Sequence, residues 1–349
     1  MTTALQANST SSGTQSTSES TSGRTRVEFR ALLSSCGVYE LSRRSKIRLT
    51  GSDRVRWLNG MVTNNVRDLT VNHGVYAFLL NAQGHIQADL YAYNMGDSLL
   101  VDADAALREK IIAHFDKFII MDDVEVTDVS ATFAAIGVAG PKAKAIMEAA
   151  GIHLPELAPL EMCTPRCDCA CDCLQCTVVR VDDRADAASV SHEIWLPPDK
   201  LKPTWDALMA TGATAVGEEA LELRRISWGV PRYGVDIRER DLPQETGQMR
   251  ALNFSKGCYL GQEIVERIRS RGAVHRQFTA FFVEGPLPAP GAKIQAEEKD
   301  VGEITSSADL PLPAGDRAVA LGYLRREALG ENLRAGSATL KPASLPIES

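Results

Sequence analysis

The sequence predicts a multi-domain α+β protein that contains a ferredoxin-like (split βαβ) unit and ends in a small antiparallel β-barrel. The first observation is length, because 349 residues can form two or three domains, each with its own core. The second is the order strand, helix, strands, helix and strand in the first half of the chain. The third is a change after residue 275 to short apolar strands separated by proline and glycine, which is typical of a barrel.

Composition and charge exclude several classes of protein. Hydrophobic residues make up 44% of the chain and charged residues 24%, as in soluble globular proteins. The formal net charge of −7 argues against nucleic-acid binding through a basic surface. No apolar run could span a bilayer, and the first residues lack the basic and apolar regions of a secretory signal. We therefore expect a cytoplasmic protein with no direct nucleic-acid partner and no membrane partner, whose eight cysteines are thiols or metal ligands.

Three regions are expected along the chain. Residues 1–26 form a tail rich in Ser and Thr, with too few large apolar side chains to offset the entropy of ordering, so we expect it to be disordered. Residues 27–272 form the main folded region, which carries a Cys-rich insertion at 163–176. Residues 273–349 form the barrel domain.

Apolar alternation and turn residues predict the individual elements. A helix begins near Ser52 or Asp53, which suit an N-cap, and ends at Gly60. Another follows Pro141, since proline favours a helix start. The expected strands of the folded region are 38–41, 46–50, 75–80, 86–93, 98–102, 124–126, 133–138, 177–181 and 193–196. The expected helices are 52–60, 105–118, 141–150, 199–209 and 218–228, and the segments from 98 to 150 form the split βαβ unit. The expected barrel strands are 277–283, 293–295, 301–305, 318–324 and 337–340.

The densest chemistry lies in the segment F-S-K-G-C-Y-L-G-Q-E, which spans residues 254–263. Gly261 is a plausible helix start, so Cys258 would lie near the electropositive end of a helix. Lys256 adds a formal positive charge, and both effects favour the thiolate form of Cys258. The alternative is a buried structural cysteine in a turn, because a cysteine thiol also packs as a small hydrophobe.

A second candidate is Asp89, which lies in the otherwise apolar strand 86–93. A carboxylate there must be exposed, paired or used, because burying it alone is costly. It could accept the fork of N–H donors that a pterin ring presents, or it could be solvated or ion-paired.

A cluster of six cysteines within 14 residues is a candidate metal site. In a reducing compartment such thiolates bind zinc, copper(I) or an iron–sulfur cluster. Only the pair at 173 and 176 has the spacing of a structural zinc site, and a passive or redox-labile loop is the alternative. The six residues are Cys163, Cys167, Cys169, Cys171, Cys173 and Cys176.

Four motifs carry a resemblance to a known family. They are K-G-C-Y-x-G-Q-E at 256–263, G-S-D-R-V-R-W-L-N-G-M-V-T-N at 51–64, L-N-A-Q-G-H-I-Q-A-D-L at 80–90, and V-G-E-I-T-S-S at 301–307 with A-L-G-Y-L-R at 320–325. Together they resemble the YgfZ-type folate-binding proteins, which are relatives of the glycine-cleavage T-protein (GcvT) and include iron–sulfur assembly factors.

The resemblance implies a GcvT-like fold around a central cavity for tetrahydrofolate or a derivative. It implies that Cys258 is a nucleophile or transient metal ligand whose pKa Lys256 lowers, and that Asp89 is a candidate for group transfer. It further implies a role in iron–sulfur cluster assembly or repair, and thereby in tRNA modification, with iron–sulfur client or assembly proteins as partners. The expected folate-binding residues are Met61, Val62, Thr63, Asn64, Asp89, Arg225, Tyr259 and Gln262.

The sequence also departs from the T-protein pattern. The glutamate of the T-protein motif L-R-L-E-A-G is Ser227 here, and the Y-T-G-E loop is replaced by residues 187–190. Both departures weaken the case for aminomethyl transfer. Arg225 stays in register and could anchor an anionic folate tail or pair with an acid. A folate-dependent aminomethyltransferase and a thiolate metal-delivery protein remain the alternative functions.

Overall fold

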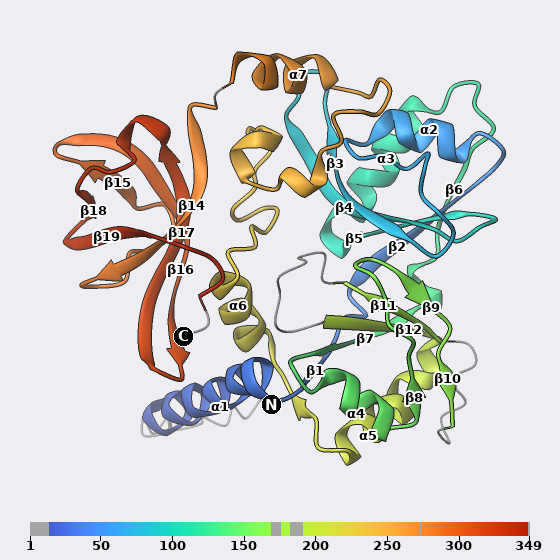
Figure 1. Cartoon of the computed structure of the whole chain (residues 1–349), viewed down its shortest axis with the longest axis horizontal. Helices are drawn as coiled ribbons and strands as arrows, with labels where there is room; N and C mark the ends of the chain where they lie inside the picture. The colour runs from blue at the N-terminus through green and yellow to red at the C-terminus, as the bar shows by residue number, and fades with distance from the viewer. Residues whose placement is uncertain (1–13, 169–175, 182–190, 273, 348–349) are drawn as a thin grey trace, which may run out of the picture.

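The computed structural model describes residues 14–168, 176–181, 191–272 and 274–347. Two sheets with their helices and a closed barrel surround the centre of the molecule (Figure 1). The predicted α+β class and the C-terminal antiparallel barrel are both confirmed. No helix in the described ranges has the length and apolar character needed to cross a membrane.

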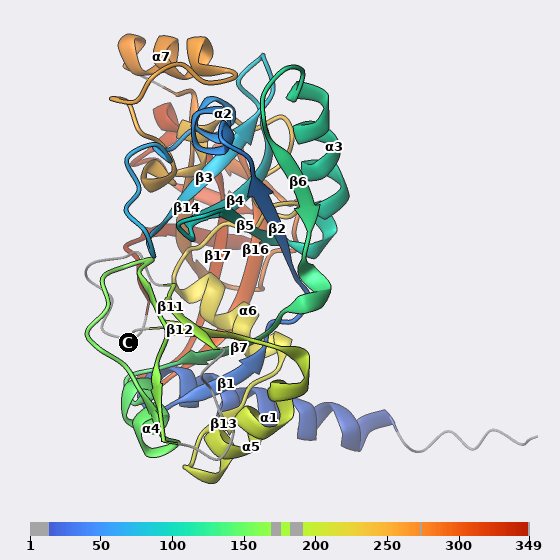
Figure 2. The same ribbon diagram turned by 90° about the vertical axis from the view of Figure 1, so that its right-hand side faces the viewer.

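The first sheet has five antiparallel strands in the order β3-β4-β5-β2-β6. Its apolar face packs on α2 (Arg54–Met61) and α3 (Arg108–Phe118), where Trp57 meets Phe115 edge to face with ring centroids 5.2 Å apart. Figure 2 shows α3 running beside this sheet. The opposite face presents Tyr76, Tyr91 and Tyr93 toward the rest of the protein. The strands are β2 (Arg44–Thr50), β3 (Gly74–Leu80), β4 (Ile86–Asn94), β5 (Leu99–Asp104) and β6 (Glu125–Asp128).

The second sheet has the order β13-β1-β7-β12-β11-β9 and is covered on one face by α4 (Ala143–Ala149) and α5 (Leu201–Ala210). Its other face meets the first sheet, where Trp195 and Tyr93 pack edge to face at 5.0 Å. The strands are β1 (Gly37–Glu40), β7 (Ala134–Ala139), β9 (Met162–Cys163), β11 (Thr177–Arg180), β12 (Ser191–Leu196) and β13 (Thr214–Ala215), and β8 (Ile152–His153) pairs separately with β10 (Arg166–Cys167).

The segment 98–150 does not stay within one sheet. Strands β5 and β6 belong to the first sheet, whereas β7 and α4 belong to the second. The reason is that β7 pairs with β1, which lies almost a hundred residues earlier in the chain. A local pattern of strands and helices carries no information about such a distant partner.

The barrel is closed in the order β14-β17-β16-β15-β18-β19. It packs on α6 (Glu218–Ser227) and α1 (Thr14–Ser34), while α7 (Gln262–Arg271) precedes it at the far end of the molecule (Figure 1). The short strand β18 was not predicted. The strands are β14 (Arg276–Glu284), β15 (Lys293–Ala296), β16 (Lys299–Leu312), β17 (Gly315–Arg325), β18 (Leu333–Ala335) and β19 (Ala338–Ala343).

Part of the predicted disordered tail is helical. Helix α1 begins at Thr14, so residues 14–26 differ from the expectation, and residues 1–13 lie outside the described residues. Phe29 and Leu32 are fully buried in the core between α6 and the barrel, and Arg26 forms a bidentate ion pair with Asp316 at 2.7 and 2.8 Å. Of these contacts only that of Arg26 lies in the predicted tail, and the tail's composition does not reveal it because Asp316 lies in a distant part of the chain.

Candidate functional site

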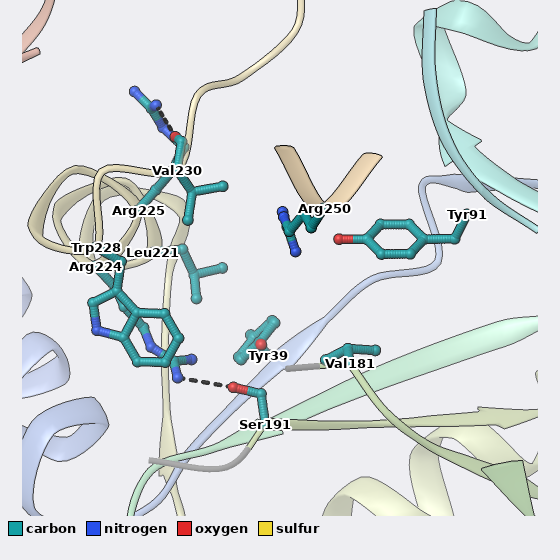
Figure 3. A pocket seen from close by; sticks show the side chains of 10 residues that line it. All are labelled: Tyr39, Tyr91, Val181, Ser191, Leu221, Arg224, Arg225, Trp228, Val230 and Arg250. Atoms are coloured by element: carbon teal, nitrogen blue, oxygen red, sulfur yellow. Dashed lines mark hydrogen bonds between the residues drawn. The ribbon is translucent and has the colours of Figure 1, made fainter. Parts of the chain in front are cut away.

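A cavity of about 260 Å³ lies at the centre of the molecule, where the two sheets meet α6 (Figure 3). Helix α6 presents one face to it, since Leu221, Arg224, Arg225 and Trp228 follow the spacing i, i+3, i+4, i+7. The charged residues among its described lining are all arginines. The lining residues are Tyr39, Tyr91, Val181, Ser191, Leu221, Arg224, Arg225, Trp228, Val230 and Arg250.

Arg224 is held firmly in the cavity wall. Its side chain is buried, its guanidinium lies 4.3 Å from the centroid of the Trp228 ring, and its Nη2 donates to Ser191 Oγ at 2.8 Å. The guanidinium also acts on Tyr39: burial raises the pKa of that hydroxyl, and Arg224 opposes the rise. The carboxylate of Glu193 acts in the opposite sense and adds to the rise.

Arg250 enters the cavity from the opposite side, with the Tyr91 hydroxyl directed toward it (Figure 3). Its Nε donates to Gln248 Oε1 at 3.0 Å, and its guanidinium lies 4.5 Å from the centroid of the Tyr76 ring. The Tyr76 hydroxyl in turn donates to Asp89 at 3.0 Å. Burial raises the pKa of Asp89, and the Tyr76 hydrogen bond opposes that effect. Asp89 is thus linked to the cavity through Tyr76, without being one of its lining residues.

Arg225 lies along the cavity wall, but its guanidinium is used elsewhere. Its nitrogens donate to Asp236 (2.6 Å) and Glu222 (2.7 and 2.9 Å), and to two neutral oxygens, the Val230 carbonyl (2.6 Å) and Ser306 Oγ (2.8 Å). Burial acts to raise the pKa of Glu222, but the pairing with Arg225 keeps it below its usual value. Because Asp236 is fully buried, this is a structural ion pair, and Ser306 on β16 links both of its members to the barrel. Of the two expected roles, the structure supports pairing with an acid.

The loop Met61–Asn64 does not line this cavity; instead it positions residues that contact it. Met61 and Val62 are buried in the core beneath α2. Thr63 Oγ1 donates to the Ala251 carbonyl at 2.6 Å, and Asn64 Nδ2 donates to the carbonyls of Tyr76 and Arg250, each at 2.8 Å. The loop therefore holds the backbone of Tyr76 and of Arg250 in place.

Lys256 has a different role from the expected one. Its side chain is only 6% exposed, and its ammonium donates to the carbonyls of Asn59 (2.5 Å), Val62 (2.7 Å) and Asn64 (2.7 Å). Burial lowers its pKa to about 7. The sequence led us to expect a cation that activates Cys258, whereas the structure has a buried amine that ties the Cys258 segment to the Met61–Asn64 loop.

Cys258 is exposed in the turn that leads into α7. The neighbouring motif residues are used for packing: Tyr259 is buried, Gln262 Oε1 accepts the Tyr259 backbone N–H at 3.2 Å, and Gly261 is left-handed with φ of 82°. A Cβ on Gly261 would lie 2.5 Å from the backbone oxygen of Asn81, so the motif packs tightly on the β3–β4 turn. Cys258 is not among the residues lining the cavity.

The cysteine cluster is only partly described. Cys169, Cys171 and Cys173 lie outside the described residues. Cys176 is buried, and Cys163 and Cys167 are half-buried against the same core, where burial raises the pKa of Cys163 and favours its thiol. In the part of the chain that the structure describes, no three His, Cys, Asp or Glu residues are grouped to hold a metal ion. The described part of this loop therefore gives no support for zinc or another metal.

Several cavity residues were missed by sequence reasoning, namely Arg224, Arg250, Tyr91 and Ser191. Arg224 could have been found, because it shares a helical face with Arg225. Arg250 had no such signal, since the segment around it shows neither helical nor strand periodicity.

Two known domain families match most of this chain. Residues 10–256 match the model of the GCVT N-terminal domain, and residues 268–346 match that of the CAF17 C-terminal beta-barrel domain. The fold thus defines a protein in which two sheets and a C-terminal barrel are arranged around a central cavity. The chain belongs to the GCVT family, and the barrel places it in the YgfZ/CAF17 branch of that family. The resemblance proposed from the motifs is confirmed.

Relatives and a solved structure agree with this placement. The chain is 26% identical over 309 residues to an aminomethyltransferase of Rubrobacter xylanophilus, covering 87% of this chain and 80% of the relative. It is 26% identical over 308 residues to an aminomethyltransferase of Thermus thermophilus, with coverage of 87% and 83%. The crystal structure of glycine cleavage system aminomethyltransferase T from Bartonella henselae superposes with a TM-score of 0.80 at 20% identity, covering 93% of this chain and 89% of that one. The GcvT-like fold is confirmed.

Proposed function

We propose that this protein binds tetrahydrofolate and supports iron–sulfur cluster assembly or repair, and thereby tRNA modification, with Cys258 as its reactive group. The family to which the chain belongs binds tetrahydrofolate, which supports the first part. The observation that carries the second part is the exposure of Cys258 beside motif residues that are consumed by packing.

The residues at the centre of the molecule suit a folate. A folate combines flat rings, N–H donors on the pterin and carboxylates on the glutamate tail. The aromatic faces of Tyr39, Tyr91 and Trp228 suit the rings, and the guanidiniums of Arg224 and Arg250 suit carboxylates. Asp89 lies outside this lining and is linked to it through the hydrogen bond from Tyr76. When bound, tetrahydrofolate would supply a carrier for one-carbon units. The protein's own groups would bind and orient it, and the buried aromatic wall would exclude water.

The sulfur of Cys258 suits the reversible binding of a thiophilic metal such as iron. Iron in iron–sulfur clusters is held by cysteine thiolates, and an exposed thiolate can accept and release such a ligand position. The three hydrogen bonds of Lys256 and the buried ring of Tyr259 hold the segment on either side of the sulfur. Client or assembly proteins could therefore reach a sulfur whose backbone is well anchored.

Aminomethyl transfer is the second candidate, because the matched curated relatives are aminomethyltransferases. Against it stands Ser227, which occupies the position of the T-protein glutamate. A serine has no carboxylate to offer a ligand. The Ser227 side chain is also fully buried, and its hydroxyl already donates to the Arg224 carbonyl at 2.8 Å. Formation of methylenetetrahydrofolate from an aminomethylated lipoyl carrier tests this candidate: measurable turnover would favour it over the first.

The experiment that tests the main proposal is complementation. A strain lacking its own YgfZ-type protein receives the wild-type chain, Cys258→Ser or Cys258→Ala, and the activity of an iron–sulfur tRNA-modifying enzyme is measured. Cys163→Ser serves as the matched control, since Cys163 is half-buried and outside the motif. We expect rescue by the wild type and the control only. Full rescue by both Cys258 variants would remove the thiol from the mechanism.

A further inference from the structure

A second cavity lies on the other face of the second sheet, away from the proposed folate site. It is bounded by the start of α4, the loop 154–157 and the paired strands β11 and β12, and we call it the α4 cavity. Ser191 lines the central cavity and His192 lines the α4 cavity, because successive residues of β12 point to opposite faces of the sheet. Its volume of about 110 Å³ is far below the roughly 300–1,000 Å³ of sites that enclose a whole drug-sized ligand, so it suits a small ion.

Basic side chains from three elements line the α4 cavity. Lys144 lies on α4, Arg180 on β11 and His192 on β12. Arg180 and His192 are directly opposite each other in the antiparallel pair, which places their Cβ atoms about 5 Å apart. Burial lowers the pKa of His192 to about 4, and the positive charges of Arg180 and Lys144 act in the same direction. The imidazole is therefore neutral at pH 7 and lies close to two cations.

Two of these side chains have buried nitrogens without a partner. His192 is only 6% exposed, and among the described residues neither its Nδ1 nor the Nε of Arg180 has a hydrogen-bond partner. Arg180 donates from Nη1 to the Leu157 carbonyl at 2.8 Å, which fixes the guanidinium against the loop 154–157. Buried polar groups in native proteins are nearly always hydrogen-bonded to protein, water or an ion. Both side chains line the α4 cavity, so an ion bound there would lie beside donors that the described protein groups leave unused.

Glu156 is the one acid in the described lining of the α4 cavity, and it offsets only part of the positive charge. Its carboxylate accepts from Lys144 Nζ at 3.1 Å, and its side chain is 84% exposed. Such a solvent-exposed pair is weak. One carboxylate beside a guanidinium and an ammonium leaves one net positive charge, which favours an anion.

We propose that the α4 cavity binds a small tetrahedral oxyanion of the phosphate or sulfate class, held by Lys144, Arg180 and His192. Side chains from three elements suit an anion with four oxygens better than a carboxylate with two, and guanidinium groups pair well with phosphate. The ion replaces the exposed carboxylate of Glu156 as the partner of Lys144. The small volume excludes a nucleotide.

Calorimetry on the full-length protein at constant ionic strength tests this site, with sodium phosphate, sodium sulfate, sodium acetate and AMP as probes. We expect phosphate or sulfate to bind as one equivalent with a Kd near or below about 1 mM, and at least about tenfold more tightly than acetate or AMP. Arg180→Gln and Lys144→Gln should each weaken binding at least about fivefold, because each removes a charged donor. Lys142→Gln is the matched control, since Lys142 is an exposed lysine two residues away that does not line the cavity.

Two variants keep the inference refutable. Lys144→Gln decides the question if Arg180→Gln fails to fold, because the Lys144 side chain is 48% exposed. Glu156→Gln removes the negative charge beside the anion and should tighten binding at least about threefold. Unchanged or weaker binding in Glu156→Gln would contradict the position assigned to the anion.

The remaining outcomes each decide against the site. Absence of saturable binding by both tetrahedral ions, equal affinity for acetate or AMP, or equal effects of Lys144→Gln and Lys142→Gln would overturn the inference. Asp182, Asp183 and Asp186 lie outside the described residues, and a variant with all three replaced by Asn tests whether the chain supplies its own carboxylate. Binding that appears only in that variant would overturn the inference too. None of these results bears on folate binding, because the two cavities lie on opposite faces of the second sheet.

Discussion

Replacing Lys256 with methionine tests the strongest electrostatic feature of the structure. Burial lowers the pKa of Lys256 from its ordinary 10.5 to about 7 in the folded protein. Between these values the unfolded chain holds a proton that the folded chain has released, so raising the pH favours the folded state. This contribution to the free energy of unfolding is complete above pH 10.5 and is lost as the pH falls toward about 7.

The magnitude follows from the two pKa values. Integrating the linkage relation from pH 7 to pH 9 gives about 2 kcal/mol more stability for the wild type, an increase that Lys256→Met cannot show. Urea denaturation of both proteins at the two pH values measures the difference, with Lys202→Met, an exposed lysine on α5, as the control. From pH 7 to pH 9 we expect the free energy of unfolding of the wild type to rise relative to that of Lys256→Met by about 2 kcal/mol.

One opposing effect could refute this reasoning. The three carbonyls at 2.5–2.7 Å favour the ammonium form, because a neutral amine has only two N–H donors for three acceptors. A gap that stays constant from pH 7 to pH 9 would mean that the carbonyls offset the cost of burial. Lys256 would then be a permanent cation.

Three further predictions follow from single contacts. Gly261→Ala should lower the free energy of unfolding by at least about 1–2 kcal/mol, because φ is 82° and a Cβ would lie 2.5 Å from the backbone oxygen of Asn81. The control Gly257→Ala should be nearly neutral, because no atom lies within 4 Å of a Cβ at that position. Equal effects of the two substitutions in urea unfolding would contradict the packing argument. Iodoacetamide at pH 8 should label exposed Cys258 in the native protein and spare buried Cys36, whose pKa burial raises to about 11; peptide mass spectrometry checks this, and equal labelling would show the assigned exposures to be wrong. Arg225→Gln should cost about 3–5 kcal/mol in thermal or urea unfolding because it leaves buried acids unpaired, whereas a loss of folate affinity with unchanged stability would restore its expected role as a ligand anchor.

Much of the fold was predictable because it depends on local patterns. The hairpin β3–β4, the helices α3, α5 and α6 and the alternation of the barrel strands follow from periodicity and turn residues. Helix α1 was missed because Phe29 and Leu32 find their partners on α6 and the barrel, far away in the sequence. The division of the segment 98–150 between two sheets was missed for the same reason, since β7 pairs with β1.

The candidate site was likewise predicted only in part. The motif at 256–263 identified the segment with Cys258, whose exposure agrees with a reactive role. The motif could not say which of its residues act and which pack. Lys256 turned out to hold three carbonyls, and Arg225, chosen for its register, turned out to serve an ion pair with Asp236.

By itself the sequence determined the class of fold, the family and the exposed cysteine segment, because each is encoded by neighbouring residues or by a contiguous motif. Only the tertiary structure decided which cations face the centre of the molecule. Arg224 and Arg250 lie on different segments and line one cavity only because the two sheets and α6 pack around it. A side chain's partners, and hence its charge and its use, depend on distances in space that residue spacing does not specify.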